Sequence, residues 1–369
     1  MMKIAQVAPL HESVPPKFYG GTERVVHYLT EELVRKGHEV TLYASGDSRT
    51  SARLRPCCDE ALRLDPQCQN TLVHHVLMIE RLLQESRHYD MIHFHVDYIH
   101  FPLLRRFDMT ALTTFHWRLD LPDFLPFASE YTELPVSSIS LSQQRPLPQM
   151  NWVGTVYHGL PRNLLRFNPR PEGYLAFLGR LSPEKGIEEA VQTALRARMP
   201  LKIAAKINDF EQDYYDEVLR PLFRHPLIEF VGEIDEARKN EFLGNASALL
   251  FPIKWPEPFG LVMIEALACG TPVIAFPNGS VPEVLRHGVS GWLVDDVDGA
   301  VDAVACLGML SRRRCRAEFE HRFDAGTMAD NYLRIYKNLI NSRHERSGGR
   351  QWKKSSRLPV NTTFSPRPH

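Results

Sequence analysis

The feature of this sequence that most restricts its fold is an alternation of short apolar runs with helical periods, which occurs twice. Residues 3–9 form an apolar run, residues 22–36 carry apolar side chains at helical spacing, and residues 39–44 form the next strand-like run. The same order restarts at residues 174–178, which precede a helical stretch over residues 187–198. A repeated strand–helix–strand order predicts a parallel sheet covered by helices on both faces. The sequence therefore predicts an α/β protein with two doubly wound domains.

Length and composition agree with two ordinary globular domains. The chain has 369 residues, more than one hydrophobic core usually organises, and 43% of them are apolar. Its formal net charge of zero gives it no general attraction for nucleic acid, so we expect no nucleic-acid partner. The six cysteines show no C-x-x-C spacing, which is typical of reduced thiols. The first residues lack the apolar segment of a signal peptide and no apolar run is long enough to span a membrane, so we expect a cytoplasmic protein.

Breaks in the alternation indicate the domain boundaries. We expect an N-terminal domain over residues 1–161, a proline-containing linker over residues 162–173 and a C-terminal domain over residues 174–326. Apolar positions at helical spacing predict an amphipathic helix over residues 327–342. Residues 343–369 are rich in Ser, Pro, Arg and Lys, which predicts a disordered basic tail. This tail either contacts an anionic membrane surface, peripheral to the inner face of the membrane, or is simply solvated.

The stretch from residue 257 to residue 275 combines a loop, a short helix and a buried strand. Pro258 flanks the loop, Gly270 ends the helix, and the apolar strand follows. Glu257 lies in the loop and Glu265 lies within the helix. Each glutamate alone has a simple alternative interpretation: Glu257 favours the positive end of the helix, and Glu265 is a solvated surface residue. The whole pattern nevertheless indicates a functional site.

Two further loops between a strand and a helix have the composition of anion-binding loops. Gly20 and Gly21 precede the first helix, with Thr22 as its expected N-cap, and paired glycines let backbone N–H groups approach a phosphate. Arg180 and Lys185 bracket the equivalent turn of the second domain and are expected to face the same crevice as Glu257. The alternative for Gly20 and Gly21 is a turn that simply needs positive φ. The alternative for Arg180 and Lys185 is a solvated basic turn. Neither loop has a full nucleotide-binding fingerprint, which disfavours kinases, GTPases and dinucleotide dehydrogenases.

Three histidines and an acidic pair are weaker candidates. His116 directly follows the strand expected over residues 111–115, and ligands collect at the carboxyl ends of strands in such sheets. His93 and His95 share one face of a strand, as two metal ligands would, but no further ligand follows at a fixed spacing. Asp296-Val297-Asp298 has the letters of a metal-binding D-x-D loop, but it precedes a helix and is better explained as an N-cap with first-turn acids.

Taken together, these motifs resemble glycosyltransferase family 4 over roughly residues 1–340. The resemblance implies the GT-B fold, in which two Rossmann-like domains face each other across a cleft and the C-terminal one holds a nucleotide-sugar. It also implies retention of the anomeric configuration without a metal ion or another cofactor. The motifs that carry it are Gly20-Gly21-x-Glu23, Gly37-His38-Glu39-Val40, His116 after its strand, Tyr157-His158-Gly159, Gly179-Arg180-x-x-x-Glu184-Lys185-Gly186, Glu257-Pro258-Phe259-Gly260-x-x-x-x-Glu265-Ala266, Gly270-Thr271-Pro272-Val273, and Val281-Pro282-Glu283 through Gly288-x-x-Gly291.

The resemblance also implies roles for single residues. Arg180 and Lys185 would hold the donor diphosphate, Glu265 would accept hydrogen bonds from the ribose, and Glu257 would bind hydroxyls of the donor sugar. His116 would lie beside that sugar. The remaining donor contacts would come from the backbone of Gly20, Gly21, Phe259, Gly260 and Leu261, and the base would lie near Ile234 at the end of the strand that includes Gly232. Glu283 matches a family position but receives no role.

These expectations define a function with open details. The resemblance implies a hexosyltransferase that uses a nucleotide-sugar, with UDP-glucose as the preferred candidate and with an unknown sugar, lipid-linked or small-molecule acceptor. Two alternatives remain. A GT-B enzyme of the epimerase, hydrolase or phosphorylase type would use water or phosphate as acceptor, and a non-catalytic protein would only bind the sugar-nucleotide.

Overall fold

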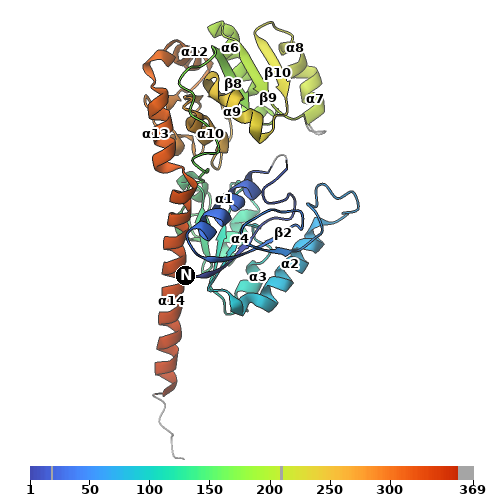
Figure 1. The fold of residues 1–369 in the computed structure, drawn as a ribbon, viewed down its shortest axis with the longest axis vertical. Helices are drawn as coiled ribbons and strands as arrows, with labels where there is room; N and C mark the ends of the chain where they lie inside the picture. Colours follow the sequence, from blue (N-terminus) through green and yellow to red (C-terminus); the bar gives the residue numbers. More distant parts are fainter. Residues whose placement is uncertain (18–19, 208–210, 356–369) are drawn as a thin grey trace, which may run out of the picture.

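The chain folds into two lobes joined by a long C-terminal helix (Figure 1). The structure is a computed structural model that describes residues 1–17, 20–207 and 211–355, with the backbone alone for residues 346–355. Each lobe contains one parallel sheet with helices packed around it. This is the two-domain α/β arrangement that the sequence predicts.

The first lobe is built on a seven-stranded sheet in which every paired strand is parallel to its neighbour. The chain order reverses between β1 and β4, so the carboxyl ends of these two strands flank a crevice. In spatial order the strands are β3 (Arg53–Pro56), β2 (Glu39–Ala44), β1 (Lys3–Val7), β4 (Met91–Phe94), β5 (Ala111–Thr114), β6 (Pro135–Ser138) and β7 (Asn151–Thr155). Its helices are α1 (Gly21–Arg35), α2 (Thr71–Glu85), α3 (Phe101–Leu104), α4 (Phe124–Glu130) and α5 (Leu141–Gln144).

The second lobe repeats this topology with six strands. The order again reverses between its first strand, β8, and its fourth, β11. In spatial order the strands are β10 (Ile228–Gly232), β9 (Leu201–Ala204), β8 (Tyr174–Leu178), β11 (Ala246–Phe251), β12 (Val273–Ala275) and β13 (Gly291–Leu293). Its helices are α6 (Ile187–Ala197), α7 (Gln212–Tyr214), α8 (Arg220–Leu222), α9 (Glu236–Gly244), α10 (Leu261–Cys269), α11 (Val281–Val284), α12 (Val297–Ala305) and α13 (Arg312–Arg322).

The last helix, α14 (Ala325–Ser355), leaves the second lobe and runs along the first (Figure 1). Lys36, the C-cap of α1, pairs with Asp330 at 2.7 Å, and Arg343 donates to the Thr110 hydroxyl at 3.0 Å. The expectation that the helix ends at residue 342 is wrong, because residues 343–355 continue it. A helix that packing has already nucleated extends at little cost, even through polar sequence. The rest of the expected tail, residues 356–369, lies outside the described residues.

A shared apolar core connects the lobes. One cluster of buried side chains includes Leu29 of α1, Tyr332 of α14 and Ile264 of α10. Elements from the two ends of the chain and from the second lobe therefore exclude water together, which orients the lobes relative to each other.

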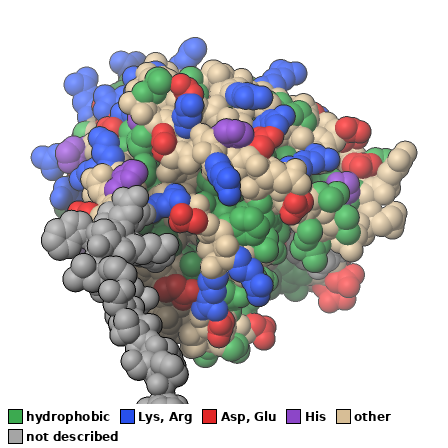
Figure 2. Space-filling view, turned by 90° about the horizontal axis from the view of Figure 1, so that it is seen from below, with side chains coloured by type: hydrophobic (Ala, Val, Ile, Leu, Met, Phe, Trp, Pro, Cys, Tyr) green, Lys and Arg blue, Asp and Glu red, His purple; other side chains and the backbone are tan. Residues whose placement is uncertain are grey.

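The outer surface of the molecule carries mixed charge. Figure 2 shows the end of the molecule formed by the first lobe, where basic and acidic side chains are interspersed around a central apolar area. Among the described residues, no helix combines the length and the hydropathy that a membrane span requires.

Candidate functional site

The candidate residues gather where the two switch points face each other. Arg180 and Lys185 lie in the loop after β8, and Glu257 lies in the loop after β11. These two strands are neighbours at the switch point of the second sheet, so the two loops start next to each other. In the first lobe, Gly20 ends the loop after β1 and His116 follows β5. The topology thus brings together residues that are far apart in the sequence.

Lys185 and Glu257 form a buried ion pair at the centre of the site. The ammonium of Lys185 lies 2.6 Å from Oε2 of Glu257, and the Trp255 indole N–H donates to the same oxygen at 2.8 Å. Gly186 lets the loop that carries Lys185 pack closely against Pro252, because a Cβ at Gly186 would lie 1.9 Å from the carbonyl oxygen of Pro252. Glu257 is only 9% exposed, so its carboxylate meets protein partners more than solvent.

Arg180 lies on the other side of the same loop. Its guanidinium contacts Glu184 at 3.1 Å and Glu211 at 3.6 Å. The two carboxylates hold a cation that has several donors and can bind an anion in a bidentate manner. The expectation that Arg180, Lys185 and Glu257 lie at one crevice is consistent with their positions on the loops after β8 and β11.

Glu265 is buried within α10 and belongs to an ion-pair network that reaches the first lobe. It is 4% exposed, which excludes the interpretation of a solvated surface residue. Lys239 of α9 contacts it at 2.8 Å and also contacts Glu236 at 3.3 Å. Arg24 of α1 pairs with Glu236 across the lobe interface. Ile234, just before α9, is half-buried against the same core as α10.

Two helix N-termini converge between the lobes. Helix α1 begins at Gly21 and helix α10 begins at Leu261, and a Cβ added to Gly21 would lie 3.6 Å from Cδ1 of Leu261. Gly260 precedes α10 at φ +77°, a conformation that favours glycine. The first N–H groups of a helix have no acceptor within the helix and carry a partial positive charge, so the gap between two helix N-termini suits an anion.

The first glycine of the pair has a steric role as well. Gly20 has extended backbone at φ 171°, so the alternative of a positive-φ turn is wrong. A Cβ at Gly20 would lie 2.8 Å from Cβ of Pro16. The expectation that Thr22 caps α1 is also wrong, because the helix already begins at Gly21 and Gly20 is its N-cap.

His116 lies at the first-lobe side of the cleft in a stack of rings. It packs against the ring of His158 with centroids 5.2 Å apart, and His158 meets Phe259 of the second lobe at 4.8 Å. Its Nε2 lies 2.8 Å from Nδ1 of His95. Burial lowers the pKa of His116 to about 3, so the ring is neutral at physiological pH.

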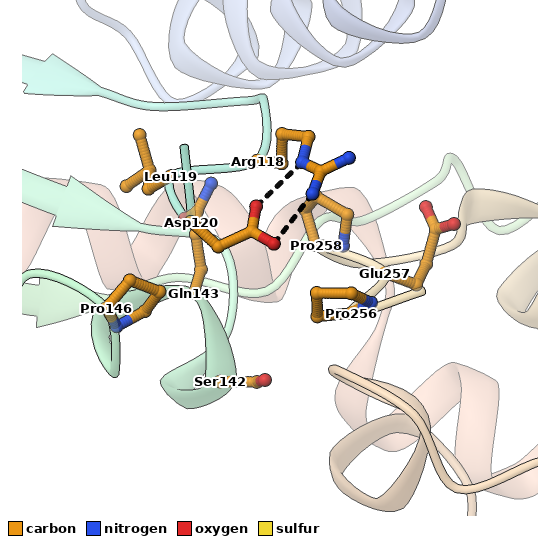
Figure 3. A pocket seen from close by; sticks show the side chains of 9 residues that line it. All are labelled: Arg118, Leu119, Asp120, Ser142, Gln143, Pro146, Pro256, Glu257 and Pro258. Atoms are coloured by element: carbon orange, nitrogen blue, oxygen red, sulfur yellow. Dashed lines mark hydrogen bonds and ion pairs between the residues drawn. The ribbon is translucent and has the colours of Figure 1, made fainter. Parts of the chain in front are cut away.

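A small pocket opens between the lobes, lined by residues of both (Figure 3). Arg118 and Asp120 of the first lobe form a two-point ion pair at 2.7 and 2.8 Å, and the Arg118 guanidinium lies over the Trp255 ring. Pro256 and Glu257 of the second lobe form the facing wall. The pocket thus shares Glu257 with the ion pair to Lys185.

Glu283, which the sequence left without a role, joins the lobes. Its carboxylate accepts from the backbone N–H groups of Leu141 and Ser142 at 2.7 and 2.6 Å and from the Tyr157 hydroxyl at 3.1 Å. These N–H groups open helix α5, whose N-terminus favours a negative charge. Arg322 in turn donates to the Glu283 carbonyl. Glu283 is therefore an interlobe contact.

The weaker metal candidates have other roles. Asp296 caps α12 by accepting from the Gly299 N–H at 2.9 Å, as the N-cap interpretation predicts. Both ring nitrogens of His93 and of His95 are occupied by hydrogen bonds to protein atoms. Among the described residues, no group of three or more His, Cys, Asp or Glu side chains is arranged to hold a metal ion.

Sequence reasoning missed several site residues. Trp255 lies two positions before Glu257, so its place next to the motif was a usable signal. Lys239 and Arg24 gave no such signal, because each reaches the site only through the packing of α9 against α10 and of one lobe against the other.

Two family models match consecutive parts of the chain. The model described as Glycosyltransferase Family 4 matches residues 19–172, and the model described as Glycosyl transferases group 1 matches residues 166–307. Together they span both lobes and include every candidate residue described above.

Whole proteins resemble the chain over nearly its full length. A phosphatidyl-myo-inositol mannosyltransferase from Mycolicibacterium smegmatis is 28% identical, with 92% of this chain and 94% of that protein covered. The structure of a sucrose-phosphate synthase from Thermosynechococcus elongatus matches with a TM-score of 0.76 at 20% identity, over 93% of this chain and all of that one. The Anabaena protein HepE in complex with UDP-glucose matches with a TM-score of 0.68 at 18% identity, over 92% of this chain and all of that one. The two structures show a shared GT-B fold.

Proposed function

The chain belongs to the group 1 glycosyl transferases of family 4, and from this premise we propose that it moves a hexose from a UDP-sugar to an acceptor hydroxyl, with retention of configuration and without a metal ion. One observation carries the proposal. The N-termini of α1 and α10 face each other beside Arg180 and Lys185, in the cleft between two sheets. Two cationic side chains, each now paired with a carboxylate, and two helix N-termini are therefore available to meet an anionic donor in this cleft.

The donor diphosphate binds at this place in the proposal. Arg180 chelates phosphate oxygens, and Lys185 exchanges its contact with Glu257 for a contact to the diphosphate. Backbone N–H groups of Gly20, Gly21 and the segment from Phe259 to Leu261 complete the anion site. The leaving diphosphate gains charge as its bond to the sugar lengthens, so these groups stabilise the transition state more than the bound donor.

The two buried glutamates bind the two sugars of the donor. Glu265 accepts hydrogen bonds from the ribose hydroxyls, and the Lys239 ammonium, 2.8 Å away, holds its carboxylate in place. Glu257 accepts from hydroxyls of the hexose, with Trp255 holding one of its oxygens. His116 lies beside the hexose from the first lobe, and the base lies near Ile234.

The reaction proceeds on one face of the sugar. The bond from the anomeric carbon to the diphosphate oxygen breaks, the acceptor oxygen bonds to the same face, and the acceptor proton passes to the departing diphosphate. A double displacement would need a carboxylate beneath the anomeric carbon. In the proposal Glu257 binds hydroxyls of the hexose and Glu265, paired with Lys239, binds the ribose, so neither carboxylate is assigned a place beneath the anomeric carbon, which favours the single-face route.

The donor identity rests on similarity to proteins of known ligand or activity. HepE was crystallised with UDP-glucose, which supports a UDP-sugar for this chain. Thermal unfolding in the presence of UDP-, GDP- and ADP-sugars tests it, because a specific ligand raises Tm by mass action. We expect UDP-glucose or another UDP-hexose to raise Tm most. Stabilisation by a GDP-sugar alone would contradict the donor assignment while leaving the family intact.

The acceptor is a sugar or a lipid-linked molecule in the proposal. The similar mannosyltransferase is named for a phosphatidyl-inositol acceptor, which supports the lipid-linked case. A basic segment starting at residue 343 could then bring the enzyme to an anionic membrane surface. Co-sedimentation with anionic vesicles, with and without residues 343–369, tests this step. Equal sedimentation of the two forms would remove the segment from the mechanism.

A further inference from the structure

A continuous chain of buried hydrogen bonds lies beneath His116 and is not used by any role assigned above. His95 follows β4, and its Nδ1 lies 2.8 Å from Nε2 of His116. The other nitrogen of His95 lies 2.8 Å from Oε1 of Gln6, in the middle of β1. Gln6 and His95 are at most 2% exposed. Polar side chains this deep in a central sheet are costly unless each finds a partner, so their arrangement calls for a reason.

With the Gln6 amide oxygen facing His95, the hydrogen bonds define which nitrogen of each ring carries the proton. The amide oxygen of Gln6 can only accept, so Nε2 of His95 must carry a hydrogen. A neutral imidazole has one N–H, which leaves a lone pair on Nδ1 of His95. That lone pair faces Nε2 of His116, so His116 must donate from Nε2. The remaining nitrogen of His116, Nδ1, then carries no hydrogen.

The contacts at the far end of the chain agree with this orientation of the Gln6 amide. The Gln6 amide nitrogen donates to the Tyr336 hydroxyl at 3.2 Å. The Tyr336 hydroxyl donates a hydrogen bond to Nδ1 of His93 at 2.7 Å, and Nε2 of His93 donates to the Thr114 hydroxyl at 2.7 Å. Each group thus donates in one direction and accepts from the other. Helix α14, which carries Tyr336, therefore contributes the far end of a chain that leads to His116.

The remaining nitrogen of His116 is left without a protein partner among the described side chains. Nδ1 is buried, and within residues 1–17, 20–207 and 211–345, whose side chains are described, it has no hydrogen-bond partner. The His116 ring stacks on the ring of His158, which in turn meets Phe259, in the loop before α10, edge-on. Burial lowers the pKa of both His116 and His158, so neither ring is charged. A neutral ring can accept from a hydroxyl and does not oppose the positive charge that develops on the sugar.

We propose that Gln6 and His95 are positioning residues that hold His116 as its Nε2–H tautomer, so that its bare Nδ1 accepts a hydrogen bond from a hydroxyl of the donor sugar. The inference rests on the proposed function only in naming the sugar as the ligand. The tautomer itself is a property of the free protein and is measurable without any substrate.

The test reads the His116 tautomer by NMR in the full-length protein labelled with ¹⁵N-histidine. The His116 signals are assigned by their loss in His116→Asn. In the wild type we expect a protonated Nε2 and an unprotonated Nδ1. Gln6→Leu removes the acceptor for His95 and should give a mixture of His116 tautomers. Gln6→Glu keeps an oxygen facing His95 and should restore the wild-type pattern.

Two results would overturn the proposal. One is a wild-type His116 protonated at Nδ1, and the other is an unchanged His116 tautomer in Gln6→Leu. If Gln6→Leu does not fold, Tyr336→Phe gives the same test from the far end, because loss of the hydroxyl lets the Gln6 amide turn over. An unchanged tautomer there would equally contradict the role of the chain.

Activity separates this proposal from the proposed function. With UDP-glucose as the probe and UDP release as the readout, Gln6→Leu should lower kcat about tenfold with little change in donor KM, and Gln6→Glu should recover most of it. No UDP release by the wild type with any nucleotide-sugar would reject the function and leave the tautomer result standing. An altered tautomer with unchanged kcat would reject the positioning role and leave the function standing.

Discussion

The two lobes share one topology but place opposite kinds of chemistry at their switch points. The second lobe has charged pairs there: Lys185 with Glu257, and Lys239 with Glu265. The first lobe has two glycines at a helix start and a neutral chain of histidine, glutamine and tyrosine side chains. A charged leaving group needs fixed charges, whereas a sugar that becomes positive needs uncharged, oriented acceptors. In the proposed mechanism, the shared fold therefore places the ligand at the switch points. The second lobe supplies charges for the leaving group, and the first lobe supplies uncharged acceptors for the sugar.

Removing a charge from the second lobe should have the largest effect. Lys185→Ala and Arg180→Ala are each expected to lower kcat about 10²- to 10³-fold, because each loses charge stabilisation that peaks in the transition state. Steady-state UDP release measures this. Lys254→Ala is the matched control, since Lys254 pairs with Glu189 on the same lobe at 40% exposure and should keep near-normal turnover. Near-normal turnover in both site variants would contradict the assignment of Lys185 and Arg180 to the diphosphate.

The next largest effect should be on donor affinity. Glu265→Gln keeps the shape of the side chain but loses the charge that strengthens its hydrogen bonds to the ribose. We expect donor KM to rise roughly 10- to 100-fold with a smaller change in kcat. Inhibition by UDP alone, which contains the ribose but no hexose, should weaken by the same factor. If UDP inhibition stays unchanged, Glu265 does not bind the ribose.

The histidines of the first lobe should make stability depend on pH. Burial lowers the pKa of each in the folded state, whereas the unfolded value is 6.5, so protons bind the unfolded chain first as pH falls. Their contribution is fully present above pH 6.5 and is lost progressively below it, about 1.4 kcal/mol per histidine for each pH unit. The histidines whose pKa is lowered most are His93, His95, His100, His116 and His158.

Urea unfolding at pH 7.5, 6.5 and 5.5 measures this slope. His100→Phe is the diagnostic variant, because His100 stacks on Phe94 and lies outside the proposed site. It should unfold more easily at pH 7.5 through loss of the Thr113 hydrogen bond, yet show a shallower fall toward pH 5.5. A slope equal to that of the wild type would mean that His100 is protonated in the folded protein.

Sequence alone predicted the architecture well because strand and helix periods are local. It missed β3, a four-residue strand with two arginines, and β13, which has three residues, since such short runs carry little pattern. The sequence also predicted too early an end for α14. The polar and basic composition after residue 342 indicated disorder, whereas the helix continues to Ser355. These errors lie at edges and ends, where tertiary contacts decide the structure.

The candidate site divided in the same way. Residues next to strand ends, such as Lys185 and Glu257, were found because a loop after a buried strand is visible in the sequence. Lys239 and Tyr336 were not found, because their contacts join segments that only the fold brings together. Gln6 did leave a signal: it is the one polar residue inside the apolar run from Ile4 to Ala8. A polar residue within an apolar strand is costly to bury without a partner, so its position in the sequence already indicates a buried hydrogen-bond network.

Loosening the contact between the lobes should have a modest effect. Glu283→Gln removes the charge that faces the N-terminus of α5, while α14 and the shared core still hold the lobes together. We expect KM for donor and acceptor to rise about two- to fivefold, with a larger radius of gyration by small-angle X-ray scattering. Glu318→Gln is the control, because Glu318 pairs with Arg286 and Arg322 of its own lobe. Equal behaviour of the two variants would show that Glu283 does not join the lobes functionally.

Removing divalent metal ions should have the smallest effect of all. In the proposed mechanism, Arg180, Lys185 and two helix N-termini meet the charge that a metal ion would otherwise neutralise. Turnover in excess EDTA should therefore equal turnover without it, in both the wild type and Lys254→Ala. Lys185→Ala sharpens the test: if its lost activity returns with added manganese, a metal ion can replace the ammonium, which supports the charge-neutralising role of Lys185. Loss of wild-type activity in EDTA, restored by manganese, would instead mean that the fixed charges of the second lobe are not sufficient.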